Sequence, residues 1–271
     1  MRSTLAALHA PRTTAKNERC GPQVGARIGR ATMADRASIF GAGVRTLVPE
    51  LMDDPALERG EHERALRGLS RLNAASIADR PVWRVLRSCL SPGERLSILD
   101  VATGGGDVPA RIHARGEKAG IGGLLDWSVC DASERAVEIA QHRLHAARAT
   151  GFTHDIVRDP LARRYDVVLC SLFLHHLSAQ DAVRALRHMA EAAGCCLIVS
   201  DLRRSVGGLA LAAFASRVLS RSRVVHTDAV LSARAAWTVE EARLLAHEAG
   251  LSGAVVQACR PSRWLLVWRR P

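Results

Sequence analysis

Residues 96–107 carry the feature that most constrains the fold: an apolar strand, a glycine-rich turn and a helix start follow one another without a gap. The run from Leu96 to Val101 holds one acid, Asp100, near its end. Gly104 to Gly106 lack the Cβ atoms that would keep a ligand away from the backbone. The turn therefore predicts a ligand site at the N-terminus of a helix that starts near Asp107, where free N–H groups point outward.

Two common nucleotide-binding patterns do not fit this turn. A dinucleotide fingerprint G-x-G-x-x-G that starts at Gly104 would need its third glycine at position 109, which is Pro109. The chain also lacks the G-x-x-x-x-G-K-[ST] pattern of a phosphate-binding loop. What remains is an acid at the strand end followed by alternating small residues. The alternative to a ligand site is a tight strand-to-helix turn in some other α/β protein.

The run Asp-Val-Ala-Thr-Gly-Gly-Gly-Asp, residues 100–107, resembles motif I of the class I S-adenosylmethionine (SAM) methyltransferases. It is most similar to the ubiquinone/menaquinone-biosynthesis C-methyltransferases, which also carry alanine where most members have their first glycine. The resemblance covers about residues 60–271. It implies SAM as the cofactor, with Asp100, Ala102, Gly104 and Gly106 in its site.

Acids follow the next two predicted strands. Leu124 to Cys130 is an apolar run that ends at Asp131, and Asp155-Ile156 comes later. The resemblance assigns Asp131 to the SAM ribose and Asp155 to the adenine amino group, with Ile156 packed on the adenine ring. From the residues alone, Asp131 is also a good helix N-cap and Asp155 a solvated loop acid.

The run from Tyr165 to Ser171 predicts a buried strand that leads into Leu-Phe-Leu-His-His-Leu, residues 172–177. In the resembling enzymes this region faces both cofactor and substrate, which implies a place for Ser171 in the cofactor site. His175 and His176 are the candidate general bases, because unperturbed histidine titrates near neutral pH. The alternative for each is a structural histidine that bonds a loop carbonyl.

Strand-like runs alternate with helical periodicity from residue 96 onward. This alternation predicts a doubly wound α/β fold whose seven-stranded sheet is mostly parallel, with ligands bound beyond the carboxyl ends of the strands. Arg260-Pro261-Ser262 is too short for a crossover, so the last two strands should form an antiparallel hairpin. The predicted strands are 96–101, 124–130, 153–156, 165–171, 194–200, 253–259 and 263–269, and the predicted helices are 107–116, 133–147, 179–193 and 239–249, the last opened by a Thr238–Glu241 capping box.

Composition divides the chain into three parts. Residues 1–45 mix Arg, Gly, Ala and Thr without periodicity and predict a basic, disordered extension. Residues 46–92 predict a helical cap with helices over 61–75 and 81–90, and residues 93–271 form the predicted SAM-binding domain. In the resembling enzymes such helices cover the cofactor and substrate cleft. Packing against the sheet edge is the alternative.

The segment after the fifth strand has two parts. Val206 to Leu219 is an apolar helix, for which core packing is the default interpretation and a lid over an apolar substrate is the sharper hypothesis. The pattern over 221–228 favours a polar loop on the cleft wall, and its His226 and Asp228 are reserve candidates for the base.

Charge and cysteine content exclude several classes of protein. The formal net charge is +11, but +6 of it falls in residues 1–45, so it is weak evidence for a nucleic-acid-binding face. Seven cysteines without a C-x-x-C pair predict free thiols in a reducing compartment, and no metal-ligand spacing occurs. Leu5 to Leu8 is too short for a signal-peptide core, and no apolar run reaches the ~20 residues of a membrane span. We therefore expect a cytoplasmic protein.

These observations predict a SAM-dependent methyltransferase that acts on a small aromatic or phenolic, quinone-like or polyketide-like acceptor, at carbon or oxygen. A lipid-like acceptor would add a surface contact with lipid but no span. One alternative is a nucleic-acid methyltransferase that uses the basic arm. Against it, Ser171-Leu172-Phe173 stands where base-amino-methylating enzymes have Asn/Asp-Pro-Pro-aromatic, so no nucleic-acid partner is expected. The other alternative is a protein that binds SAM but does not catalyse a reaction.

Overall fold

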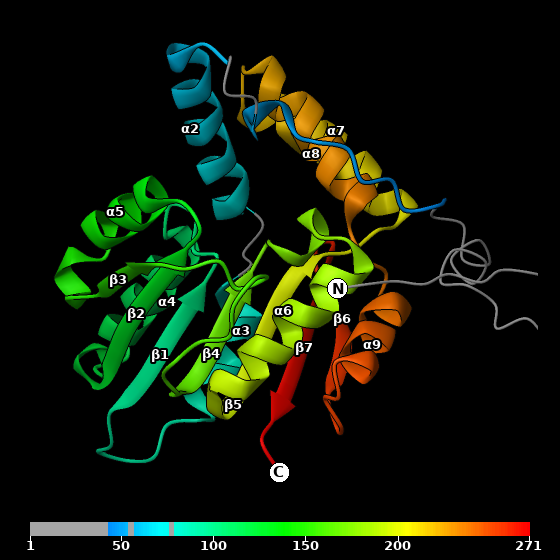
Figure 1. Ribbon diagram of the computed structural model, residues 1–271. Coiled ribbons are helices and arrows are strands. Elements are labelled where there is room, and N and C mark those ends of the chain that lie inside the picture. The colour runs from blue at the N-terminus through cyan, green and yellow to red at the C-terminus, as the bar shows by residue number, and fades with distance from the viewer. Residues whose placement is uncertain (1–42, 54–56, 76–78) are drawn as a thin grey trace, which may run out of the picture. The chain divides into compact units, whose positions relative to one another are not determined.

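A computed structural model describes residues 43–53, 57–75 and 79–271. It contains one seven-stranded sheet with the order β3-β2-β1-β4-β5-β7-β6 (Figure 1). The strands are β1 (Leu96–Val101), β2 (Leu125–Asp131), β3 (Thr150–Thr153), β4 (Tyr165–Ser171), β5 (Ala193–Leu202), β6 (Val255–Cys259) and β7 (Arg263–Arg269). Strands β1 to β5 are parallel, and β7 runs antiparallel to both β5 and β6. The predicted doubly wound sheet with a terminal hairpin is confirmed.

Helices cover both faces of this sheet and one of its ends. The α-helices are α2 (Arg59–Ala75), α3 (Asp79–Arg87), α4 (Asp107–Lys118), α5 (Glu134–Arg143), α6 (Ala179–Ala192), α7 (Val206–Leu219), α8 (Arg223–Ala235) and α9 (Val239–Glu248). The 3-10 turns are η2 (Leu51–Asp53), η3 (Gly122–Leu124), η4 (His145–Ala147) and η5 (Leu174–His176). Figure 1 shows α2, α7 and α8 together above the end of the sheet to which the parallel strands point.

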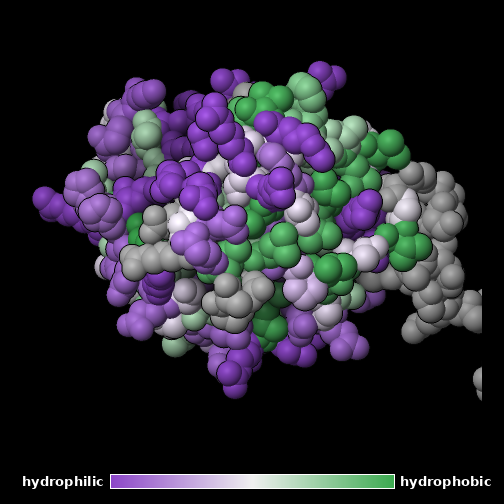
Figure 2. Space-filling model, turned by 90° about the horizontal axis from the view of Figure 1, so that it is seen from above, coloured by the Kyte–Doolittle hydropathy of each residue, from purple (hydrophilic) through white to green (hydrophobic). Residues whose placement is uncertain are grey.

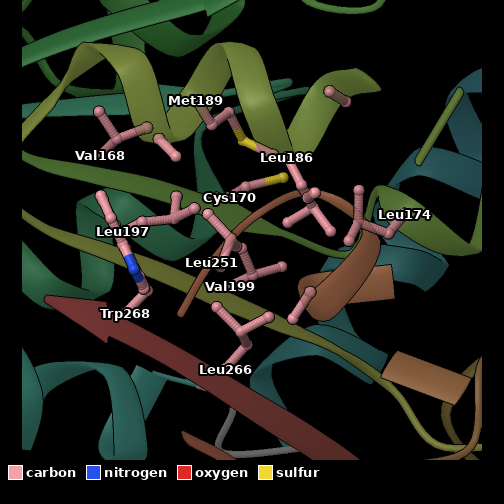
Figure 3. Packing of buried hydrophobic residues seen from close by; sticks show 14 of the residues in the cluster. Val168, Cys170, Leu174, Leu186, Met189, Leu197, Val199, Leu251, Leu266 and Trp268 are labelled. Carbon is pink, nitrogen blue, oxygen red and sulfur yellow. The ribbon is translucent and has the colours of Figure 1, made fainter. Parts of the chain in front are cut away.

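Two apolar clusters hold the helices on the sheet. One lies between the sheet and helices α6 and α9, and Figure 3 shows part of it, including Leu186, Met189 and Leu197. The other joins the opposite face to α3 and α4 through residues such as Leu86 and Ile112. Because both faces are covered, the central strands β1 and β4 consist of nearly continuous buried residues. This is why their bounds could be predicted to the residue.

The edge strand was placed three residues too late. The prediction put a strand at 153–156, whereas β3 is Thr150–Thr153 and pairs with β2. All four β3 residues are exposed or half-buried, so no apolar alternation marks the strand. Its place is set by pairing with β2, including a 2.9 Å hydrogen bond between the hydroxyls of Ser128 and Thr150.

The predicted loop at 221–228 is wrong, because most of it forms the first half of helix α8. Val224 and Val225 are buried against Ala65 of α2, which a polar-loop interpretation overlooked. The two helices of the predicted cap also separate. Helix α2 packs on α7 and α8 above the strand ends, whereas α3 packs on the face of the sheet.

Arg45 was predicted to be the last residue of the basic extension, but the structure places it inside the folded part. Its Nη2 donates to the carbonyls of His175 and Leu177 at 2.8 Å each. Its guanidinium carbon lies 3.6 Å from the centroid of the Trp237 ring. Residues 1–42 lie outside the described residues, so a disordered extension there stays a prediction. Among the residues described, no helix is long and apolar enough to cross a membrane.

The predicted capping box of α9 is present and includes one half of a buried ion pair. Glu241 accepts the backbone N–H of Thr238 at 2.8 Å and two hydrogen bonds from Arg204, at 2.7 and 2.9 Å. The Arg204 and Glu241 side chains are 1% and 8% exposed. Removing one charge of such a pair leaves the other buried without compensation.

We therefore predict that Glu241→Gln lowers the free energy of unfolding by about 3–5 kcal/mol in a urea titration. The neighbouring Glu240 is the matched control, because its side chain is 53% exposed and lies 3.8 Å from Arg243. Glu240→Gln should change stability by less than about 0.5 kcal/mol. Equal effects of the two substitutions would contradict this account.

Candidate active site

The glycine turn after β1 leaves an open space next to its backbone. Gly104 has φ +52°, and a Cβ placed there would meet no atom within 4 Å. Gly106 has φ +71°, but its Cβ would lie 2.9 Å from the Cα of Ala140 in α5. Gly106 is thus required for packing, whereas Gly104 borders the space that a ligand would use. Ala102, which stands at the first glycine position of motif I, also has φ +52°.

Asp131 connects this turn to the end of β2. One carboxylate oxygen accepts the N–H of Gly104 at 2.9 Å, and the other accepts the N–H of Ser133 at 3.0 Å. The N-cap of α5 is Ser133, whose hydroxyl accepts from Ala136 N, so the interpretation of Asp131 as the cap is wrong. Each carboxylate oxygen keeps a free lone pair, so Asp131 can accept further hydrogen bonds from a diol.

Two buried polar atoms beside the turn have no hydrogen-bond partner among the described residues: Asp100 Oδ1 and Ser171 Oγ. The other oxygen of Asp100 accepts from the hydroxyl of Thr103 at 2.6 Å. Burial raises the pKa of Asp100 to about 7. The negative charge of the nearby Asp131 raises this pKa further, whereas the hydrogen bond from Thr103 lowers it. A cation near this carboxyl would stabilise its ionised form, so the strand ends suit a positively charged ligand.

Asp155 and Ile156 follow β3, as the motif order requires, but both have structural contacts. Asp155 Oδ1 accepts the N–H of Val157 at 3.0 Å and thereby closes a turn. Ile156 is 2% exposed within the main apolar cluster, and its carbonyl accepts from His188 Nδ1 at 2.8 Å. The adenine roles of these two residues stay predictions.

His175 is fixed by a buried carboxylate that the sequence interpretation did not single out. Asp201, at the end of β5, is fully buried and accepts from the His175 backbone N–H at 2.9 Å and from its Nδ1 at 2.7 Å. Burial alone raises the pKa of Asp201, but the charge and hydrogen bond of His175 and a hydrogen bond from Leu202 N bring it below its ordinary value. Because an ionised carboxylate only accepts, Nδ1 must donate, and Nε2 is left as the second ring nitrogen.

His176 stacks beside it at a ring-centroid distance of 4.1 Å. Its Nδ1 lies 3.9 Å from a carboxylate oxygen of Glu50, which also accepts from the Ser232 hydroxyl. Burial and the charge of His175 lower the pKa of His176, so it stays neutral near pH 7. Donor atoms of Glu50, His175 and His176 lie within 4.8 Å of one another, so this group could also accept a metal ion.

A cavity of about 430 Å³ lies between the strand ends and helices α2, α7 and α8, and both histidines line it. At the end of β4 it is bordered by Leu172, which has φ +58°, a strained conformation for a branched residue. Its apolar wall includes Leu69, Leu72, Leu211, Ala212, Ala215, Leu219, Ala229 and Ala233. Only Gly208 and Ser216 of α7 are buried, so this helix covers a cavity rather than packing in the core.

The outer surface of the same helices is also apolar. Val206, Phe214 and Val218 of α7 are 65–69% exposed, and Leu47 and Val48 are 46% and 43% exposed. Figure 2 looks down on this side and shows apolar surface gathered among polar surroundings. The cavity is therefore covered by a thin helical layer rather than by the core of the domain.

The reserve candidates for the base lie outside the cavity, which corrects their predicted place on the cleft wall. Asp228 accepts the N–H groups of Leu51 and Met52 at 2.8 and 3.0 Å and thus holds η2 on α8. His226 Nε2 donates to the carbonyl of Ser220 at 2.8 Å. Cys170 is fully buried, which raises the pKa of its thiol, as expected for an inert cysteine.

The site residues that sequence reasoning missed are Asp201, Leu172 and Arg203. Asp201 ends a strand as Asp100 and Asp131 do, and this shared position was the available signal. No pattern marks the positive φ of Leu172, or the place of Arg203 in the wall of the cavity.

Comparison with known proteins finds a matching domain model. Residues 98–193, which run from β1 to the start of β5, match the family model of a methyltransferase domain. No curated protein matches the sequence. The glycine turn, Asp131 and the strands β2 to β4 lie inside the matched residues. This match assigns a methyltransferase domain to residues 98–193, and the solved structures below share its fold.

Solved structures share this fold at low identity. SibL, an S-adenosylmethionine-dependent methyltransferase in its apo form, is 19% identical with a TM-score of 0.57, over 83% of this chain and 63% of that one. The plantazolicin methyltransferase BpumL, in complex with a monoazolic desmethylPZN analogue and S-adenosylhomocysteine (SAH), is 14% identical with a TM-score of 0.52, over 78% and 88%. PigF with SAH is 17% identical with a TM-score of 0.50, over 71% and 56%. The chain thus spans less than two thirds of SibL and PigF.

We predict that Gly104→Ala weakens SAH binding at least tenfold, because the new Cβ enters the open space beside the turn. Gly120→Ala is the matched control: Gly120 has φ +72° and equally open surroundings, but it follows α4 at the other end of the sheet. Both substitutions should cost about 1 kcal/mol of stability from the left-handed backbone. Calorimetric titration with SAH should separate them, and equal affinities would remove Gly104 from the cofactor site.

Proposed function

We propose that this enzyme transfers the methyl group of SAM to a small, largely apolar acceptor with an acidic hydroxyl group, such as a phenol or an enol. The observation that carries the proposal is the cavity of about 430 Å³, whose wall is apolar and whose polar residues include the Asp201-bound His175. The motif I resemblance to quinone-biosynthesis methyltransferases supports an aromatic, quinone-like or polyketide-like acceptor. Methylation at oxygen and at carbon both remain within the proposal.

The residues beside the glycine turn fit the cofactor. Gly104 leaves space next to the backbone, Asp131 has lone pairs for the ribose hydroxyls, and Ser171 offers an unpartnered hydroxyl. Asp100 would balance the positive charge of the cofactor without direct exposure, since it is 2% exposed. Bound SAM supplies an activated methyl group on a sulfonium, so the protein needs mainly to align the acceptor and exclude water.

In this proposal His175 takes the proton of the acceptor. Asp201 holds Nδ1–H, so Nε2 carries the lone pair that a general base needs. The loop that carries His175 is anchored on both sides, since Trp237 Nε1 donates to Leu174 O and Arg45 donates to His175 O. A base held in one orientation lowers the entropy cost of proton transfer. His176 and Glu50 complete the polar side of the cavity.

The proposed cofactor site predicts a pH-dependent affinity for SAH, whose ammonium group is positively charged. Below pH 7 Asp100 is protonated in the free enzyme and must lose its proton when a cation binds. The affinity should therefore fall about tenfold from pH 8 to pH 6 if the bound enzyme keeps Asp100 ionised. Calorimetry in buffers of different ionisation enthalpy should show proton release near pH 6.5.

Asp100→Asn is the control for this titration, since its affinity for SAH should not vary over the same pH range. A folded wild-type protein that binds no SAH at either pH would overturn the proposed cofactor site. An affinity that is equal at pH 6 and pH 8 would remove Asp100 from it.

The proposed base predicts that His175→Asn lowers kcat by about 10²–10⁴-fold on a phenolic acceptor found by mass-spectrometric screening, with SAH affinity unchanged. Asparagine keeps a donor near Asp201 and removes the second ring nitrogen. His226→Asn, in α8 and outside the cavity, should leave kcat unchanged. EDTA should have no effect. A loss of activity in EDTA that a divalent cation restores would assign Glu50, His175 and His176 to a metal instead.

A further inference from the structure

One end of the cavity carries two arginines, Arg203 and Arg263, and the charges of Asp201 and Asp79 act on Arg263. The residues there come from the end of β5, the start of α7 and the turn before β7, and they include Arg203, Gly208, Ser262 and Arg263. Among the described lining residues the only carboxylate is Glu50, which lies beside His176. The wall of the cavity is therefore polar beside Glu50, His175 and His176 and basic at Arg203 and Arg263, and most of the rest is apolar.

The guanidinium of Arg203 makes no hydrogen bond or ion pair with the described residues. Its Nε is buried and unpartnered, although an arginine has five N–H donors to satisfy. A buried donor left unpaired is unfavourable, so this group calls for an acceptor from outside the described residues. Arg203 thus differs from Arg45 and Arg204, which donate to backbone carbonyls or to Glu241.

The backbone of Arg203 is held from two sides. Its N–H donates to Ser262 O at 3.0 Å, and its carbonyl accepts from the Ser262 hydroxyl at 3.3 Å. An isolated bridge pairs it with Trp237. Gly208 closes this end tightly, because a Cβ there would lie 2.4 Å from Ser262 Oγ. The side chain therefore starts from a rigid part of the cavity wall.

We propose that Arg203 binds a carboxylate of the methyl acceptor, which makes the acceptor a hydrophobic carboxylic acid. The planar guanidinium matches a carboxylate in shape and charge, and Arg263, 3% exposed at the same end, adds positive charge. The apolar body of the acceptor then lies along α2, α7 and α8, and its acidic hydroxyl lies at His175. This inference rests on the proposed function for the identity of the reacting end, but the carboxylate site itself does not.

The test compares two probes that differ only in the carboxylate: 2-hydroxy-6-pentylbenzoate and 3-pentylphenol. Their binding to the full chain is measured by calorimetry with and without SAH. The wild type should bind the benzoate at least tenfold more tightly. Arg203→Gln should weaken the benzoate about 10- to 100-fold and leave the phenol unchanged. Arg203→Lys should restore part of the preference, because it keeps the charge but not the planar fork.

Arg184→Gln is the control variant, since Arg184 is half exposed on α6 and pairs with Asp181. It should leave both affinities unchanged. Equal binding of the two probes to the wild type would overturn the proposal even if Arg203→Gln failed to fold. Equal weakening of both probes in folded Arg203→Gln would do so as well.

Failure of the proposed function gives a different result. If SAH does not bind but the benzoate still binds through Arg203, the carboxylate site stands and the assigned methyl transfer falls. If SAH binds and phenols are methylated without any preference for the carboxylate, only the present inference falls.

Discussion

The buried carboxylate of Asp201 is the constraint on which the geometry of the candidate active site depends. It lies at the end of β5 and accepts three hydrogen bonds, from the backbone and ring of His175 and from the backbone of Leu202. A buried carboxylate stays ionised only when such donors surround it, so the β4–α6 loop must pass within reach of β5. The parallel pairing of β4 and β5 makes this possible, because it brings the two carboxyl ends to the same edge of the sheet.

Other long-range contacts act on the same loop. Trp237 donates to Leu174, and Arg45 donates to His175 and Leu177 while it stacks on Trp237. The positive φ of Leu172 at the start of the loop is a strained conformation that these contacts can hold in place. The loop is thus positioned by residues from the N-terminal segment, β5 and the α8–α9 connection.

Sequence reasoning reached the parts of the fold that depend on local pattern. The apolar runs of β1 and β4, the glycine turn and the capping box of α9 each have a signature within ten residues, and the structure has all of them. The strand β3 was misplaced because an exposed edge strand lacks alternation, and the helix α8 was missed because its apolar face shows only against α2. His175 was found as a candidate, but the carboxylate that orients it was not.

The sequence by itself determined the order of the strands and of most helices, the turn that opens the candidate cofactor site and the chemical types of residue at the strand ends. These follow from hydrophobic periodicity and from the steric freedom of glycine, which are properties of short segments. Only the tertiary structure decided that α2, α7 and α8 enclose one cavity, that Asp201 orients His175, and that Arg203 lines this cavity with an Nε that has no partner among the described residues. The physical reason is that burial and pairing depend on which segments meet, and contacts between residues as far apart as Arg45 and Trp237 leave no trace in local pattern.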